Sequence, residues 1–221
     1  SSIGMLAGRV AHEINNPLAA ILAQTQLMLM DSVPDDSLYG SLKDIERAAL
    51  RCRKIVQDLL NFSRQKVTDR RTKHDLQQII EQTLDIYALV PPRDGAKTTV
   101  HLEPHLPLVR VDPDKLKSVF LNLLSNAKAA TPSDGKIDLY VSLLEQEAKK
   151  EIQIRVQDTG QGIPIALQEQ IFMPFFTTKA PGLGTGLGLY IVRELVKEHE
   201  GRIELESKEG KGTEFKIFLP I

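Results

Sequence analysis

The chain has 221 residues, of which 42% are hydrophobic and 26% are charged, a composition typical of a globular protein with a buried core. Its formal net charge of −1 gives no reason to expect binding to nucleic acid or to an anionic membrane surface. The single cysteine, Cys52, excludes an internal disulfide, and no apolar run approaches the ~20 residues of a membrane span. We therefore expect a cytoplasmic location, with no nucleic-acid partner and no membrane contact by this segment. Because the chain begins abruptly in helix-like sequence at Ser1, we also expect an upstream region, where a membrane anchor would lie.

Two amphipathic helices are predicted at the start of the chain. Apolar residues recur at spacings of three, four or one over about residues 3–30, and a similar stripe runs over about residues 41–64. Residues 31–39, which include Pro34, are predicted to form a loop, so the two helices make an antiparallel hairpin. A lone hairpin cannot cover its own apolar stripe. We expect dimerisation into a four-helix bundle, with packing on the C-terminal part of the same chain as the alternative.

A polar and basic stretch, residues 66–73, separates the hairpin from a region of different character. Helices are predicted there at residues 76–89, 114–130 and 187–200, and strands at 98–102, 109–112, 136–144, 151–158, 202–207 and 212–219. The predicted fold class is α+β, a helical hairpin followed by an α/β sandwich with helices over one face of a mixed sheet. The predicted domains are the hairpin at 1–66 and the sandwich at 73–221, joined by a linker at 67–72.

The first chemical motif is His12-Glu13-Ile14-Asn15-Asn16-Pro17 in the first helix. A zinc-binding His-Glu-x-x-His helix would need a histidine where this chain has Asn16, a poor zinc ligand. A neutral imidazole can instead act as a nucleophile while Glu13 holds or accepts its proton. Asn16, one turn along on the same face, could orient a water or substrate oxygen, and Pro17 should kink the helix. The other histidines are interpreted as ordinary surface or core residues: His74, His101, His105 and His199.

Three further motifs predict a nucleotide site. Asn122 and Asn126 are four residues apart on one helix face, and amide oxygens are suitable ligands for Mg²⁺. Asp158 ends a strand, where a carboxylate can accept a hydrogen bond from an adenine amino group, and glycines follow it. The Gly-rich stretch 182–188 precedes a helix, and its N–H groups and the helix dipole can cradle phosphates, although it is neither a Walker A loop nor Gly-x-Gly-x-x-Gly. Phenylalanines within 171–179 suggest a lid, or a buried aromatic cluster.

Taken together and in this order, the motifs resemble those of the homodimeric sensor histidine kinases of two-component systems. Residues 12–18 resemble the H box, 122–130 the N box, 158–164 and 184–188 the two glycine boxes, and 172–176 the F box. The match covers nearly the whole chain. The resemblance implies a dimerisation and phosphoacceptor hairpin, and an ATP-binding domain of the type shared with gyrase and the heat-shock chaperone ATPases.

The resemblance also implies a role for each matching residue. His12 would take the γ-phosphoryl group of ATP with Glu13 as base, and the phosphoryl group would pass to an aspartate of a response-regulator receiver domain. Asn126 would hold Mg²⁺ with Asn122 in support, and Asp158 would bind adenine. The other nucleotide-binding positions would be Gly160, Gly162, Phe175, Lys179, Gly184, Thr185, Gly186, Leu187, Gly188 and Thr213.

Two positions modify these expectations. Many relatives carry a basic residue three positions after the magnesium asparagine, where this chain has Ala129. Lys128 is one position earlier, a rotation of about 100° on a helix, so a phosphate contact is not assigned to it. Asn16 matches the position where relatives with phosphatase activity place an amide or hydroxyl, so phosphatase activity toward the partner is expected. The alternatives are an ATP-driven clamp without phosphohistidine, a non-enzymatic dimeric scaffold, and a protein-serine/threonine kinase of the same superfamily.

Overall fold

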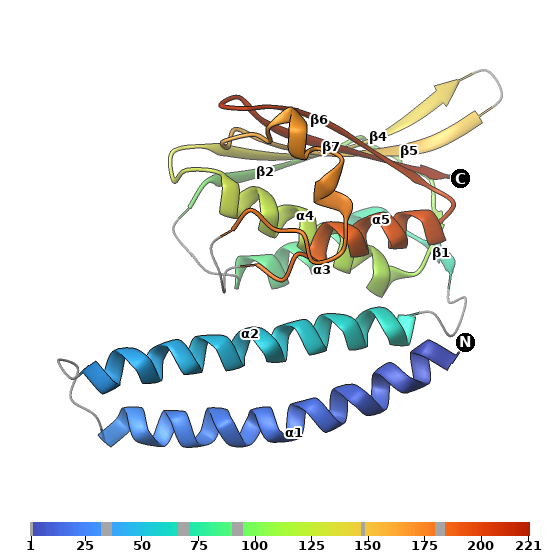
Figure 1. Cartoon of the computed structure of the whole chain (residues 1–221). Coiled ribbons are helices and arrows are strands. Elements are labelled where there is room, and N and C mark those ends of the chain that lie inside the picture. Colours follow the sequence, from blue (N-terminus) through green and yellow to red (C-terminus); the bar gives the residue numbers. More distant parts are fainter. Residues whose placement is uncertain (1, 32–36, 66–70, 90–94, 147–148, 180–183) are drawn as a thin grey trace. The chain divides into compact units, whose positions relative to one another are not determined.

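The computed structural model describes residues 2–31, 37–65, 71–89, 95–146, 149–179 and 184–221, leaving aside the side chains of 2–13, 37, 54–55, 57–65 and 146. The chain divides into two compact units. One contains Ser1–Thr68 together with Phe175–Leu187, and the other contains Asp69–Pro174 together with Gly188–Ile221. The first unit is built on a helical hairpin and the second on a sheet covered by helices (Figure 1).

The hairpin consists of α1 (Ser2–Asp31) and α2 (Ser37–Gln65), which pack along one another (Figure 1). Leu18, Leu22 and Ala49 form a buried cluster between them. The predicted loop at 31–39 is too long, because Asp31 belongs to α1 and α2 already begins at Ser37. No proline or glycine follows Pro34 before the second helix, so nothing in that stretch opposes an early helix start. The loop residues 32–36 themselves lie outside the described residues.

Much of the hairpin's apolar surface is not covered by the hairpin itself. Large apolar side chains of both helices are exposed in the single chain: Ile14, Ile21, Leu27, Met28, Met30, Leu38, Ile45 and Leu50. Ile14 and Ile21 belong to the predicted stripe of α1, yet they are 42% and 47% exposed, whereas Leu18 and Leu22 of the same stripe are buried. One partner helix therefore covers only part of the stripe.

The second unit contains a five-stranded mixed sheet with the order β2-β4-β5-β7-β6. Its strands are β2 (Lys97–Leu102), β4 (Lys136–Gln146), β5 (Lys149–Asp158), β7 (Gly212–Pro220) and β6 (Arg202–Lys208). Only β2 and β4 are parallel, and the other neighbours are antiparallel. A separate antiparallel pair joins β1 (Thr72–His74) to β3 (Val109–Val111). β1 begins at Thr72, the last residue of the predicted linker, and was not predicted, because its three polar, largely exposed residues carry no apolar alternation that would indicate a strand.

Three helices cover one face of this sheet, as predicted: α3 (Leu76–Ala88), α4 (Pro113–Ala130) and α5 (Gly188–Glu198) (Figure 1). α4 packs against both other helices and against β4 and β5. Asp112 caps α4 by accepting hydrogen bonds from the N–H groups of Asp114 and Lys115, and Pro113 occupies the first turn, where its missing N–H costs nothing. The inward face of α4 is fully apolar, and burial of a side chain such as Phe120 stabilises the fold by roughly 2–3 kcal/mol.

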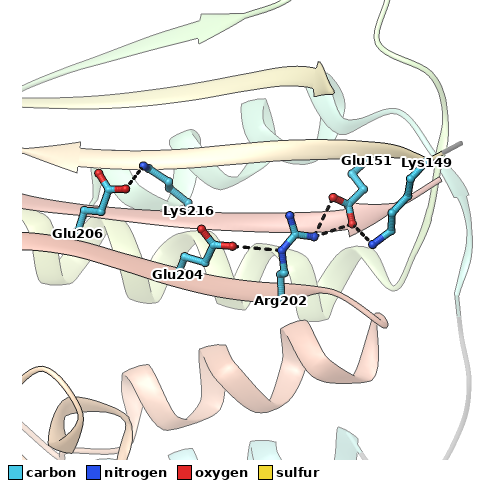
Figure 2. A network of polar contacts seen from close by, with 6 residues as sticks. All are labelled: Lys149, Glu151, Arg202, Glu204, Glu206 and Lys216. Atoms are coloured by element: carbon cyan, nitrogen blue, oxygen red, sulfur yellow. Dashed lines mark hydrogen bonds and ion pairs between the residues drawn. The ribbon is translucent and has the colours of Figure 1, made fainter. Parts of the chain in front are cut away.

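The opposite face of the sheet carries charged side chains (Figure 2). Nη1 of Arg202 donates to both carboxylate oxygens of Glu151, at 2.6 and 2.8 Å, and Lys149 and Glu204 extend the network. The hydrogen bond from Arg202, followed by that from Lys149, lowers the pKa of the Glu151 carboxyl. Glu151 is buried but the Arg202 side chain is 46% exposed, so solvent screening limits each of these pairs to about 1 kcal/mol. The alternation of charged and apolar residues on β6 and β7 leaves one face for the helices and one for water.

Candidate nucleotide site

The site is built around the C-terminal half of α4, where two asparagines face the start of α5. Nδ2 of Asn122 donates to the carbonyl of Ser118 at 2.8 Å, which fixes the amide so that its oxygen points away from the helix backbone. That oxygen lies 2.8 Å from the point where a Cβ on Gly188 would stand, and Nδ2 of Asn126 lies 3.9 Å from the same point. The two amides and Gly188, the first residue of α5, therefore lie close together.

Asp158 ends β5 beside the C-terminal end of α4. Its side chain is buried, and Oδ1 accepts a hydrogen bond from the N–H of Gly160 at 2.8 Å. Burial raises the pKa of this carboxyl, opposed by the backbone hydrogen bonds from Gly160 and Thr213. A buried carboxylate with unused acceptor capacity suits a ligand that donates a hydrogen bond.

Glycine at position 160 is required by close packing. A Cβ there would stand 2.5 Å from the carbonyl oxygen of Ala130 and 2.7 Å from Oδ1 of Asp158. The N–H of Gln161 donates to the same Ala130 carbonyl at 3.2 Å. The turn after β5 is thus held against the last turn of α4, which places Asp158 beside the helix that carries the two asparagines.

The turn between β6 and β7 supports the other side of Asp158. Thr213, which is buried, lies opposite Asp158 in the β5–β7 pairing, and its hydroxyl is 2.9 Å from that of Ser207. Ser207 also accepts the N–H of Ile163 at 2.8 Å. Ser207 was not predicted from the sequence, because a single serine on a strand carries no motif.

The glycine-rich segment and its phenylalanine belong to the first unit. Here the described residues form two arms, 175–179 and 184–187, and residues 180–183 lie outside the described part. A Cβ on Gly184 would stand 2.7 Å from Oγ1 of Thr177, and Gly186, at φ +70°, would place one against the backbone of Phe175. The two arms therefore lie directly against each other. They carry the predicted nucleotide-binding positions Phe175, Lys179, Gly184, Thr185, Gly186 and Leu187.

The predicted phosphoacceptor motif lies within α1, about halfway along. The side chains of His12 and Glu13 lie outside the described residues, but the described backbone puts His12 and Asn16 one helical turn apart, on the same face. The side chain of Asn16 is exposed. Pro17 sits inside the helix, where it removes one backbone hydrogen bond.

Two further side chains take structural positions. Nζ of Lys128 lies 5.0 Å from the centre of the Tyr87 ring on α3, a cation–π contact on a different side of α4 from the asparagines. His199 is buried, with Nδ1 2.7 Å from the carbonyl of Leu195 and Nε2 accepting the N–H of Asp112 at 3.0 Å. Burial lowers the pKa of His199, so this imidazole is neutral and bridges α5 and α4.

Comparison with known families defines the class of protein that this fold and site belong to. The chain belongs to the histidine kinase-, DNA gyrase B- and HSP90-like ATPases, whose family profile matches residues 111–221. Residues 2–67 match the His kinase A (phosphoacceptor) domain. The two matches together identify the catalytic core of a sensor histidine kinase, which confirms the predicted class and the α+β fold.

Individual relatives are similar over almost the whole chain. Sensor kinase CckA of Brucella abortus (strain 2308) is 36% identical over 99% of this chain and 24% of the relative. The signal transduction histidine-protein kinase AtoS of Escherichia coli (strain K12) is 34% identical, over 100% of this chain and 35% of the relative. The sensory histidine kinase/phosphatase NtrB of Escherichia coli O157:H7 is 34% identical, over 96% and 60%. The chain therefore spans less than two thirds of the length of each of these relatives.

Solved structures show the same architecture. Full-length ShkA in complex with AMPPNP superposes with a TM-score of 0.74 over 98% of this chain and 45% of that chain, at 23% identity, a likeness of fold. The catalytic domain of histidine kinase ThkA has a TM-score of 0.59 at 30% identity, over 68% of this chain and 95% of that one. Among the helices that the structure describes, none has the length and apolar character to cross a membrane.

Proposed function

We propose that this chain phosphorylates His12 with ATP and passes the phosphoryl group to an aspartate of a response-regulator receiver domain. The observation that carries the proposal is the meeting of Asn122, Asn126 and Gly188 on α4 and α5, in a chain whose first helix bears His-Glu-x-x-Asn. Amides at a helix N-terminus can bind the phosphates of a nucleotide, and the histidine can accept a phosphoryl group from it.

The residues present fit a nucleotide with its metal. Amide oxygens are hard ligands of the kind Mg²⁺ prefers, so Asn126 would hold the ion with Asn122 in support. The absent Cβ of Gly188 leaves room beside the Asn122 oxygen at a helix N-terminus, where the dipole favours phosphate. The buried carboxylate of Asp158 would accept a hydrogen bond from the adenine amino group, with Gly160, Gly162 and Thr213 shaping its surroundings. When bound, Mg²⁺ neutralises charge on the phosphate oxygens.

The proposed lid would complete the phosphate site. Its positions Gly184, Gly186 and Gly188 would offer N–H groups to the phosphates, with Phe175, Lys179, Thr185 and Leu187 lining the closed segment.

The chemical step is a phosphoryl transfer. An imidazole nitrogen of His12 attacks the γ-phosphorus of ATP, so that an N–P bond forms and the bond to the β-phosphate oxygen breaks, releasing ADP. Glu13 holds and accepts the proton of the imidazole. Catalysis then consists chiefly of positioning and charge neutralisation. In the second step a receiver carboxylate attacks the phosphorus, and the N–P bond to His12 breaks.

The active form is proposed to be a homodimer formed through the hairpin. Ile14, Ile21, Leu27, Met28 and Ile45 are exposed in the single chain. A second hairpin packed against them would bury this surface in a four-helix bundle. The proposed boundaries of the dimerising hairpin, linker and ATP-binding domain are residues 1–66, 67–72 and 73–221, with residues 67–70 outside the described part.

We further propose phosphatase activity toward the phosphorylated receiver. Asn16 is exposed one turn from His12, where an amide can orient a water for attack on an acyl phosphate. NtrB, one of the similar proteins, is named a histidine kinase/phosphatase. Replacing Asn16 with alanine should slow receiver dephosphorylation while His12 labelling persists. Equal dephosphorylation by the variant would argue against a role for Asn16.

Labelling with γ-phosphate-labelled ATP tests the main proposal. The wild-type chain should acquire label that is lost in acid and stable in alkali, and His12→Gln should acquire none although it binds ATP. Label on the His12 variant, or acid-stable label on serine, would refute it. ATP hydrolysis without label would favour a clamp, and absence of ATP binding would favour a scaffold. Mixed dimers of His12→Gln and Asn126→Ala chains then decide whether transfer occurs within or between subunits.

A further inference from the structure

Arg71 is the first residue after α2 that the structure describes, and its guanidinium lies on the C-terminal end of α5. Nη1 donates to the carbonyl of Glu198 at 3.3 Å and to the carboxylate of Glu200 at 2.8 Å. The arginine side chain is 24% exposed, whereas that of Glu200 is 72% exposed. The last carbonyls of a helix lack hydrogen-bond donors within the helix and carry partial negative charge. A guanidinium at this place donates to such a carbonyl and also compensates the partial charge.

The same end of α5 is fixed to α4 from the other side. The buried ring of His199 bridges the carbonyl of Leu195 and the N–H of Asp112, the residue that caps α4. Nζ of Lys115, whose side chain is only 12% exposed, forms an ion pair with Glu198 at 2.9 Å. The surface on which Arg71 rests is therefore rigid, because both helices that form it are tied together.

The chain enters the domain at this place. Directly after Arg71, β1 pairs with β3 over Thr72–His74 and Val109–Val111, and β3 leads straight into Asp112. The entering strand and the Arg71 contacts thus converge on the junction of α4 and α5. α5 itself starts at Gly188, beside the asparagine face, so one helix connects the proposed phosphate cradle with the point of chain entry.

We propose that this linker anchor, defined as Arg71, Glu198, His199 and Glu200, positions the ATP-binding domain for phosphoryl transfer to His12. This inference rests on the proposed function. The tether between α2 and the anchor consists of residues 66–70, which can span at most about 18 Å. Arg71 fixes the point at which the chain enters the domain. Without the anchor the connection from α2 gains one residue, about 3.5 Å.

If Arg71 positions the domain, its loss should change the rate of His12 labelling but not the affinity for ATP. A purely structural role would change both quantities together. In the proposed function, nucleotide affinity depends on Asn122, Asn126 and Asp158, which lie near the start of α5 and at the end of β5, whereas the anchor lies at the C-terminal end of α5. The labelling rate at saturating ATP depends on how often the bound nucleotide reaches His12 in a productive geometry. Loss of the anchor should therefore lower the rate and leave the affinity unchanged.

The test uses the full chain and three variants, Arg71→Gln, Glu200→Gln and Lys73→Gln. Lys73 is the matched control, since it is an exposed cation two residues further along the chain, within β1. For each variant we would measure ATP affinity by titration, the first-order rate of His12 labelling at saturating ATP, and the thermal midpoint. We expect Arg71→Gln to slow labelling on the order of tenfold with ATP affinity within about twofold of wild type.

The companion variants sharpen this result. Glu200→Gln should slow labelling less than Arg71→Gln, because the Glu198 carbonyl still accepts from Arg71, and Lys73→Gln should behave as wild type. The inference is overturned if Arg71→Gln labels His12 at the wild-type rate, or if its ATP affinity falls in parallel with its rate. Failure of the proposed function looks different, since the wild-type chain itself would then acquire no label on His12.

Discussion

Replacing Asp158 with asparagine should weaken ATP binding and at the same time stabilise the free protein. The buried carboxylate already accepts from the backbone of Gly160 and Thr213. Asparagine keeps the shape but presents one oxygen instead of two, so an adenine amino group would lose its charged acceptor. A hydrogen bond to a charged group is worth about 1.5–3 kcal/mol, and the loss corresponds to roughly 10- to 100-fold in affinity.

The effect on stability has the opposite sign. Burial raises the pKa of Asp158 above its ordinary value of 3.8, so the folded state favours the neutral acid. The protonated Asp158 side chain therefore contributes to the stability of the fold below pH 3.8, and this contribution is lost as the pH rises through the raised pKa of the folded state. At neutral pH the ionised group therefore destabilises the fold, and Asp158→Asn should raise the free energy of unfolding by about 1 kcal/mol. In wild type, ATP affinity should fall as the pH is lowered through the same raised value.

Calorimetric titration with ATP and GTP, together with urea unfolding without nucleotide, measures both effects. Guanine carries a carbonyl where adenine carries its amino group, so the variant should also discriminate less between the two nucleotides. Asp134→Asn is the control, since it removes the same charge from an exposed turn. Unchanged ATP affinity and selectivity in Asp158→Asn, or an equal loss in Asp134→Asn, would refute the assignment of Asp158 to adenine.

Three other outcomes follow from the contacts. Gly188→Ala should weaken Mg·ATP binding on the order of tenfold in the same titration, because the new Cβ displaces the Asn122 oxygen 2.8 Å away, while the thermal midpoint stays within a few degrees. The free energy of unfolding should decline as the pH falls below 6.5, because the pKa of His199 is lowered in the folded state and the unfolded state therefore binds the proton first. Urea unfolding at several pH values between 7.5 and 5.5 should show this decline in the wild type and a weaker dependence on pH in His199→Gln. Arg202→Ala should lower the free energy of unfolding by about 1–2 kcal/mol, because it removes the contacts of Arg202 with the Glu151 carboxylate and with the Phe218 ring, whose centre is 3.8 Å from the guanidinium carbon. The affinity for ATP should not change.

Periodicity in the sequence was sufficient for most of the long elements, although it placed the start of α2 four residues late, and it was insufficient for the short ones. α1 and α4 carry apolar residues every three or four positions, so their extents were predicted within a residue or two. β1 has three polar residues and was missed, and so were the 3₁₀ turns η1 (Ile165–Leu167) and η2 (Gln170–Phe172). Such pieces are held by their partners in space, and their own residues carry no pattern.

The sequence by itself determined the chemical groups of this protein: an imidazole followed by a carboxylate and an amide, two amides one turn apart, a carboxylate at a strand end, and glycines before a helix. Tertiary structure decided which of these groups meet. Gly188 faces Asn122, and Gly160 closes on Ala130, only because α5 and the turn after β5 pack against α4. The anchor of Arg71 on α5 joins residues more than a hundred positions apart. Local sequence carries no record of such contacts, because they arise from the burial of apolar faces whose partners lie elsewhere in the chain.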